Sequence, residues 1–171
     1  MDLTTTRLYL IPVDAEFVQA VVDRDHTLAG ELYQLTVPPT WPGHRAAIEG
    51  LPLHLAALRA DPRELSWRIR LVVLKDDRVA IGSVVLEGPP RDGCVEIGWW
   101  LLASMRGMGF AREAAAAVID WLQAQPEVRR IIATIDDDNL ASIRIATHLG
   151  MRKTAQRQRE LPVYELTGWR E

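Results

Sequence analysis

The stretch from Cys94 to Ala117 constrains the fold more than any other part of this 171-residue chain. The apolar run Val95–Leu102 is followed by Arg106–Ala111, which reads RGMGFA, and then by an alanine-rich segment. β-branched and aromatic residues favour strands and alanine favours helices, so the order predicts a strand, a turn and a helix. The first turn of a helix presents unpaired backbone N–H groups at the positive end of the helix dipole. This arrangement suits a phosphate.

The glycines of the turn favour a close approach of a ligand to the backbone. Gly107 and Gly109 lack Cβ atoms, and Arg106 adds a positive charge at the rim. Two common phosphate motifs are excluded, because the dinucleotide fingerprint needs glycine or alanine where the chain has Arg112. A P-loop needs Lys and then Ser or Thr, which do not follow Gly109. A turn whose glycines serve packing alone is the alternative interpretation.

Composition narrows the class of protein. The chain is 48% hydrophobic and 25% charged, which is typical of a soluble globular protein, and its length suits one domain over residues 1–171. It shows neither a signal peptide nor an apolar run near the roughly 18 residues that span a bilayer, so we expect a cytoplasmic protein without a membrane partner. One cysteine and four scattered histidines predict no metal site, and a net charge of −3 predicts no nucleic-acid partner.

The remaining segments predict a mixed, mostly antiparallel α/β sheet flanked by helices, because antiparallel hairpin strands surround a single strand–helix–strand unit. The loop 37–43 holds three prolines, and Pro52 is expected to kink or break its helix. The closing strands are expected to join near Pro162. Expected strands are Arg7–Val13, Trp67–Lys75, Arg78–Glu87, Arg130–Asp136, Met151–Glu160 and Val163–Thr167, and expected helices are a short one after Asp14, Leu28–Leu35, Arg45–Ala60, one from the turn to about Gln123, and Asn139–Leu149.

A second motif lies about 30 residues after the first. The segment 136–142 reads DDDNLAS, and the helix that Asn139 opens ends at Leu149-Gly150-Met151. Together with Arg-x-x-Gly-x-Ala at Arg106–Ala111, this pattern resembles the GNAT N-acetyltransferases. Thr6-Arg7-Leu8, the Trp41 loop and Glu96–Leu101 are similar to the RimJ/RimL-type branch of that superfamily.

The resemblance implies an acetyl-CoA-dependent N-acetyltransferase without a metal, acting on a primary amine of a protein N-terminus or a small molecule. It also implies the GNAT fold and leaves a homodimer open. A non-catalytic acyl-CoA-binding or sensing domain of the same fold is one alternative, and an interaction module that binds no CoA is another. The implied acetyl-CoA contacts are Trp99, Trp100, Leu101, Arg106, Gly107, Met108, Gly109, Phe110, Ala111, Asn139 and Ser142.

Asn139 and Leu101 are two of these contacts for which a specific interaction with acetyl-CoA is expected. Asn139 would bind the pantetheine arm of CoA, and a plain N-cap is the simpler interpretation of the same residue. The backbone N–H of Leu101 would donate to the thioester carbonyl, where the sheet pairing is expected to splay apart beside Gly98.

The catalytic candidates are Glu96 and Ser142. Glu96 is a carboxyl group inside an otherwise apolar strand, so burial is expected to raise its pKa toward the range of a general base. The alternative is a structural Glu96 with water carrying the proton. Members of the family often carry a tyrosine acid where this chain has Ala146, so Ser142, Tyr164 or water must protonate the thiolate.

The acceptor pocket is expected to include Trp41, Glu96 and Trp99, although most tryptophans in a domain of this size belong to the core. Cys94 is expected to pack as a small core residue rather than to act as a nucleophile.

Overall fold

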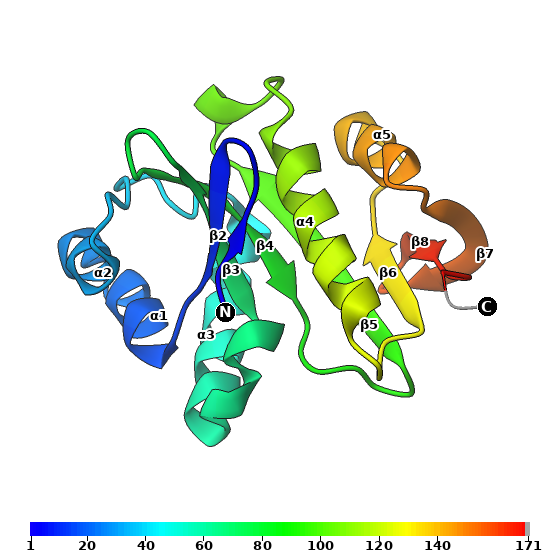
Figure 1. The fold of residues 1–171 in the computed structure, drawn as a ribbon, viewed down its shortest axis with the longest axis horizontal. Helices are drawn as coiled ribbons and strands as arrows, with labels where there is room; N and C mark the ends of the chain where they lie inside the picture. Colours follow the sequence, from blue (N-terminus) through cyan, green and yellow to red (C-terminus); the bar gives the residue numbers. More distant parts are fainter. Residues whose placement is uncertain (170–171) are drawn as a thin grey trace.

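One eight-stranded sheet runs through the computed structural model, which describes residues 1–169 (Figure 1). Its strand order is β1-β2-β3-β4-β5-β6-β8-β7, and neighbouring strands are antiparallel except for β5 and β6. The mixed, mostly antiparallel sheet expected from the sequence is therefore confirmed. The strands are β1 Leu3–Thr4, β2 Leu8–Pro12, β3 Ile69–Leu74, β4 Ala80–Leu86, β5 Cys94–Leu101, β6 Arg130–Thr134, β7 Arg152–Gln158 and β8 Leu161–Leu166.

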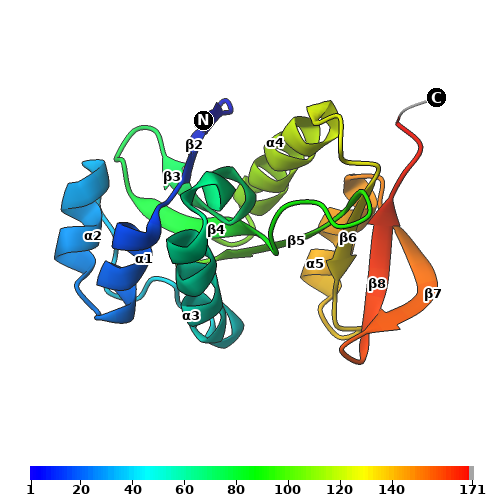
Figure 2. The same cartoon turned by 90° about the horizontal axis from the view of Figure 1, so that it is seen from below.

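The helices cover both faces of the sheet, with α1–α3 on one side and α4 on the other (Figure 2). On the side of α4 that faces the sheet, Ala114 and Ala115 are fully buried, and their small side chains let the helix lie close to the strands. No helix among residues 1–169 is both long and apolar enough to cross a membrane. The helices are α1 Ala15–Val22, α2 His26–Tyr33, α3 Arg45–Ala60, α4 Phe110–Ala124 and α5 Leu140–His148, with 3₁₀ turns at Pro62–Trp67 and Ala103–Met105.

The parallel pair β5–β6 is short, and this opens the sheet at its centre. Only Cys94, Val95 and Glu96 of β5 pair with β6, while the rest of β5 continues beside β4 alone. The Leu102 N–H donates to Ile81 O of β4, and Glu96 O accepts from Glu87 N–H. Backbone groups alternate between the two edges of a strand, so those of Trp99 and Leu101 face the opening between β5 and β6. The expected splay is present.

Two details differ from the sequence expectations. Of the kink or break expected at Pro52, the break is absent, since α3 continues through it. Pro52 lies on the exposed side of the helix, where water can solvate the carbonyl that its ring leaves unpaired. Pro162 lies inside β8, paired with Arg157, rather than in the turn. The β7–β8 turn is made by Arg159 and Glu160, whose positive φ angles of 50° and 65° suit the twist of a two-residue hairpin loop.

His54 makes a pH dependence of stability predictable. It is a 7% exposed residue of α3, and burial, with a smaller contribution from Arg68, lowers its pKa from 6.5 to about 4. The unfolded chain therefore binds a proton that the folded chain excludes, so stability is lost as the pH falls from about 6.5 toward 4. Between pH 7 and pH 5 the loss from this one group is about 2 kcal/mol.

Urea unfolding of the parent and of His54→Leu at the two pH values isolates this effect. From pH 7 to pH 5, we expect the free energy of unfolding to fall by about 2 kcal/mol more in the parent than in the variant. Equal pH dependence of both proteins would contradict the assignment.

Candidate active site

The turn between β5 and α4 forms a cradle of backbone N–H groups. Gly107 and Gly109 have left-handed φ angles of 79° and 80°, and Gly109 is the N-cap of α4. Among residues 1–169, none accepts a hydrogen bond from the backbone N–H groups of residues 107–112. A Cβ atom built on Gly107 would meet nothing within 4 Å. The cradle is thus open, unpaired and at the positive end of a helix, which fits a phosphate ligand.

Arg7, from the N-terminal segment, braces this turn from outside. Its Nη1 donates to Met108 O at 3.0 Å, its guanidinium lies 4.3 Å from the centroid of the Phe110 ring, and its Nε donates to Glu113 Oε2 at 2.7 Å. Thr5 Oγ1 also donates to Glu113, at 2.6 Å. These contacts fix the start of α4 to the edge of the sheet. They hold the N–H cradle in place before any ligand arrives.

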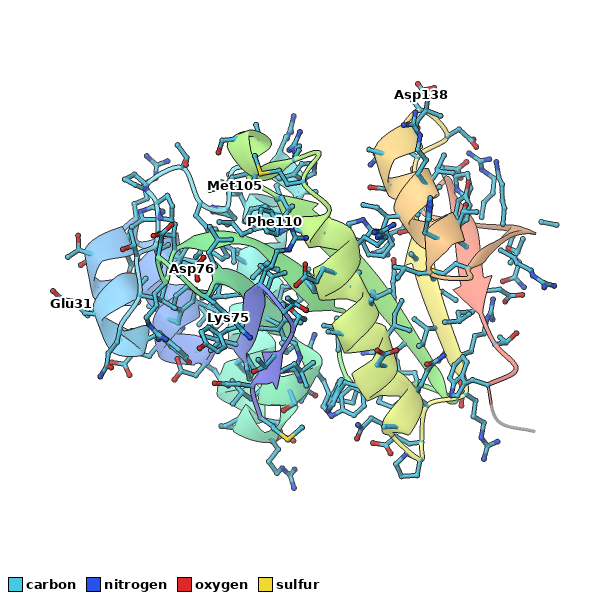
Figure 3. All side chains as sticks on the ribbon, turned by 45° about the horizontal axis from the view of Figure 1, so that its top comes forward. Glu31, Lys75, Asp76, Met105, Phe110 and Asp138 are labelled. Atoms are coloured by element: carbon cyan, nitrogen blue, oxygen red, sulfur yellow. The ribbon has the colours of Figure 1, made fainter. Side chains whose placement is uncertain are left out.

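The cradle opens into a cleft of about 550 Å³ between α4 and α5. Figure 3 places Phe110 at the start of α4 and Asp138 just before α5; Phe110 and Asn139, the residue after Asp138, line the cleft. Met108, a predicted acetyl-CoA contact, does not line the cleft and is 55% exposed. Every other predicted acetyl-CoA contact lines the cleft, namely Trp99, Trp100, Leu101, Arg106, Gly107, Gly109, Phe110, Ala111, Asn139 and Ser142.

Several cleft residues were missed by sequence reasoning. Arg112 lies in the first turn of α4, and Arg144 and His148 lie one turn apart on α5. The spacing of Ala141, Arg144, Ile145 and His148 marks one helix face, so helical periodicity would have found them once the cleft was known. His44, before α3, also lines the cleft. With Arg106, these groups give the cleft a basic lining that suits a polyanionic ligand.

Asn139 caps α5 and lines the cleft at once. Its Oδ1 accepts from the Ser142 N–H at 3.1 Å, which is the N-cap bond. Within residues 1–169, no atom accepts from its side-chain NH₂ group. The two interpretations given above therefore do not compete, because the oxygen serves the helix while the NH₂ group is free for a ligand.

Asn139→Ala and Asn139→Ser separate the two roles. Both lose the NH₂ donors, while serine keeps a cap acceptor and alanine costs about 1 kcal/mol of stability. We expect calorimetry to show weaker CoA binding by both variants, to similar degrees, with only the alanine variant melting at a lower temperature. Parent-like CoA affinity in the serine variant would leave Asn139 as a cap alone.

Glu96 lies in surroundings other than those expected. Side chains alternate between the two faces of β5, so Glu96 points to the face opposite Val95 and Ile97, which pack beneath α4. The Glu96 side chain is 13% exposed. Its carboxylate accepts from Thr134 Oγ1 and Gln158 Nε2, each at 2.8 Å, and pairs with the Arg159 guanidinium. The apolar environment predicted from the strand sequence is thus wrong, since three donors solvate the carboxylate. Glu96 does not line the cleft, but Trp100, on the same face of β5, does.

Two candidate side chains lie elsewhere. Trp41, expected in the acceptor pocket, is 2% exposed and packs in the core with its ring centroid 5.3 Å from that of Trp100. Its indole N–H donates to Gly82 O at 3.3 Å, which fixes it as a structural residue. Tyr164, an alternative acid, is 5% exposed in the core beneath α4 and α5 and does not line the cleft. Trp41 therefore does not line this cleft, whereas its neighbour Trp100 does.

Trp99 and Trp100 both line the cleft, and each carries a buried indole N–H group. The indole N–H groups of Trp99 and Trp100 find no acceptor among residues 1–169. Buried donors without partners are costly, so each of these groups lowers the stability of the fold around β5. In the same part of the chain, no three His, Cys, Asp or Glu side chains are grouped as metal ligands would be. The half-buried Cys94 has a pKa raised by burial, which disfavours the thiolate.

Comparison with known proteins decides the family. Residues 7–152 match the family model described as an acetyltransferase (GNAT) domain. The chain belongs to the GNAT acetyltransferases. It is 30% identical over 149 residues to YjdG of Bacillus subtilis (strain 168), described as an uncharacterized N-acetyltransferase, with 86% of this chain and 88% of YjdG covered. The predicted enzyme class, transfer of an acetyl group to an amine, is confirmed, and the non-catalytic alternative is not favoured.

Solved structures show the same fold. A ribosomal-protein-S5-alanine acetyltransferase from Vibrio fischeri superposes with a TM-score of 0.71 at 17% identity, covering 99% of this chain and 98% of that one. RimL, a ribosomal L7/L12 α-N-protein acetyltransferase in complex with coenzyme A, gives a TM-score of 0.62 at 19% identity, with 98% of both chains covered. The GNAT fold expected from the sequence is therefore confirmed.

Proposed function

We propose that this GNAT domain, residues 1–171, binds acetyl-CoA in the cleft between α4 and α5 and acetylates an α-amine, that of a protein N-terminus or of a small molecule. The observation that carries the proposal is the cradle of unpaired N–H groups at residues 107–112, which opens into a basic cleft. The pyrophosphate would take these N–H groups, and Arg106, Arg112 and Arg144 would neutralise phosphate charge. The pantetheine amides would meet Asn139, the open backbone edge of Trp99 and the N–H of Leu101, whose carbonyl already accepts from Arg106 Nε at 3.2 Å.

Acetyl-CoA supplies the acetyl group as a thioester, and the side chains of this chain handle the protons. The acceptor nitrogen bonds to the carbonyl carbon as the C–S bond breaks. Glu96 takes the proton from the amine, directly or through water, and the Leu101 N–H donates to the carbonyl oxygen as its charge develops. The Ser142 hydroxyl, which lines the cleft, protonates the departing thiolate, a role that water can also fill. Tyr164 takes no part.

The acceptor is assigned to the class that the RimJ/RimL-type branch acetylates, with the short N-terminal motif Thr6-Arg7-Leu8 as support. In this chain that motif has a physical task, since Arg7 braces the phosphate turn. The indole of Trp99 would border the reacting carbonyl, and Trp100 would border the acceptor. A cytoplasmic location follows from the same proposal. The proposal also includes a homodimer, which size-exclusion chromatography would test.

A two-stage assay tests the proposed function. Calorimetry first measures CoA and acetyl-CoA binding to the purified chain, and thiol release is then followed with a panel of α-amines, ε-amines and polyamines. We expect CoA binding and thiol release with α-amines above the rate of thioester hydrolysis. Absence of CoA binding would refute the site. Binding without amine-dependent thiol release would refute the proposed acceptor class.

A further inference from the structure

Arg159 occupies the approach to Glu96. It lies in the β7–β8 turn, where Arg159 and Glu160 both have positive φ angles, and its side chain is 58% exposed. Its guanidinium pairs with Glu96 Oε1 across 63 residues of sequence. The turn therefore places a positive charge on the carboxylate that is proposed to deprotonate the acceptor amine.

Most hydrogen-bond donors of this guanidinium are unused. A guanidinium carries several N–H donors in a planar fork. Only Nη2 of Arg159 has a partner, and among residues 1–169 no acceptor other than Glu96 pairs with it. Gln158 and Thr134 donate to the same carboxylate, so these two hydrogen bonds would remain if Arg159 moved away from it. The side chain is 58% exposed, so its remaining N–H groups are available to a ligand from solvent.

The neighbouring cations of the hairpin are used differently. Lys153 Nζ pairs with Asp137 at 2.6 Å, and the Arg157 guanidinium donates to Glu160 O and pairs with Asp137 at 3.6 Å. Both have partners away from Glu96 and belong to the framework of the hairpin. Arg159 alone of these three reaches the proposed base. Arg157 is thus a matched control for it.

A cation at this position bears on the choice of acceptor. An amine approaches Glu96 as an ammonium ion, and the positive charge of Arg159 on the same carboxylate repels it. An acceptor that carries its own anion beside the amine removes this repulsion. Its ammonium replaces the guanidinium at Glu96, and its anion takes the fork of Arg159. One ion pair is then exchanged for two.

Resting on the proposed function, we infer that the acceptor carries a carboxylate next to its amine and that Arg159 binds this carboxylate. Arg159 is then a specificity-determining residue, and bare polyamines are excluded as acceptors. The shared chemistry, an α-amine with a nearby carboxylate, is found both in free amino acids and in protein N-termini with an acidic second residue. The test distinguishes these two sources.

Two matched ligand pairs, each differing in one negative charge, test the inference. Alanyl-aspartate amide against alanyl-asparagine amide represents the peptide, and alanine against alaninamide represents the free amino acid. Calorimetry with the purified chain, with and without CoA, gives their affinities. Thiol release from acetyl-CoA gives kcat and KM separately.

In the parent, we expect the anionic member of one pair to bind at least about tenfold more tightly than its neutral partner. Arg159→Gln should reduce that ratio to about one or two, mainly through the affinity of the anionic ligand. Arg159→Lys should keep part of the preference, and Arg157→Gln should keep all of it. The pair that shows the preference identifies the source of the acceptor.

Three outcomes would overturn the inference. These are no charge preference in the parent, an equal preference in Arg159→Gln, and an equal loss in Arg157→Gln. Failure of the proposed function looks different, because it appears as absent CoA binding or absent thiol release with every amine. The calorimetric preference on the CoA-free chain is measured in either case.

Discussion

A Gly109→Val variant is expected to stay folded and to bind CoA at least about 100-fold more weakly than the parent. Gly109 has a φ of 80° at the N-cap of α4, a conformation that costs ordinary residues about 1–2 kcal/mol and a β-branched residue more. Relief of this strain turns the N–H groups that follow away from their common point. Calorimetry of CoA binding measures the loss, and circular dichroism checks the fold.

The structure locates the cause of this loss in the backbone rather than in a filled space. A Cβ atom on Gly109 would lie 3.5 Å from Nη2 of Arg7, an ordinary contact on the side of the brace. Gly109→Asn is therefore the matched control, because asparagine tolerates left-handed φ angles. It should keep CoA affinity within about tenfold of the parent. Equal affinity of parent and valine variant would refute the phosphate cradle, and equal loss in both variants would place the cause in the side chain.

The parts of the site that could be predicted from the sequence are those specified by local signals. Residues Arg106–Ala111 form a turn because glycines with positive φ follow a strand and precede a run of alanines. Asn139 starts α5 because its side chain caps a helix within three residues. Both motifs line the cleft as expected, since a strand–turn–helix fixes its own geometry whatever packs around it.

The parts that could not be predicted depend on contacts between distant segments. The three donors to Glu96 lie 38, 62 and 63 residues away in sequence, so nothing in the strand 94–101 indicates that the carboxylate is solvated by protein. The brace from Arg7 to Glu113 spans 106 residues. Trp41 and Trp100 are the same residue type, so the sequence does not tell them apart. Only their packing shows that Trp41 belongs to the core and that Trp100 lines the cleft.

Glu96→Gln is expected to lower kcat roughly 10²–10⁴-fold at neutral pH, the usual contribution of a general base. The amide keeps the shape of the side chain and an oxygen that can accept from Thr134, but it cannot take the proton of the amine. CoA affinity should survive, because Glu96 does not line the cleft that holds the cradle. Thiol release with saturating acetyl-CoA measures the rate. Glu165→Gln, which removes an equally negative group from strand β8 on the far side of β6, should leave it near that of the parent.

The pH profile separates a base from a structural group. The α-amine of a peptide has a pKa of about 7.7–8.0, so below this range most molecules of a peptide acceptor carry the proton that Glu96 must remove. Above it, free amine attacks without help, and the deficit of Glu96→Gln should shrink as the pH rises toward 9. A variant that merely distorts the site would lose the same factor at every pH, because amine protonation would not enter. If Glu96→Gln instead matches the parent from pH 6 to 9, Glu96 holds Thr134, Gln158 and Arg159 in place, and water is the base.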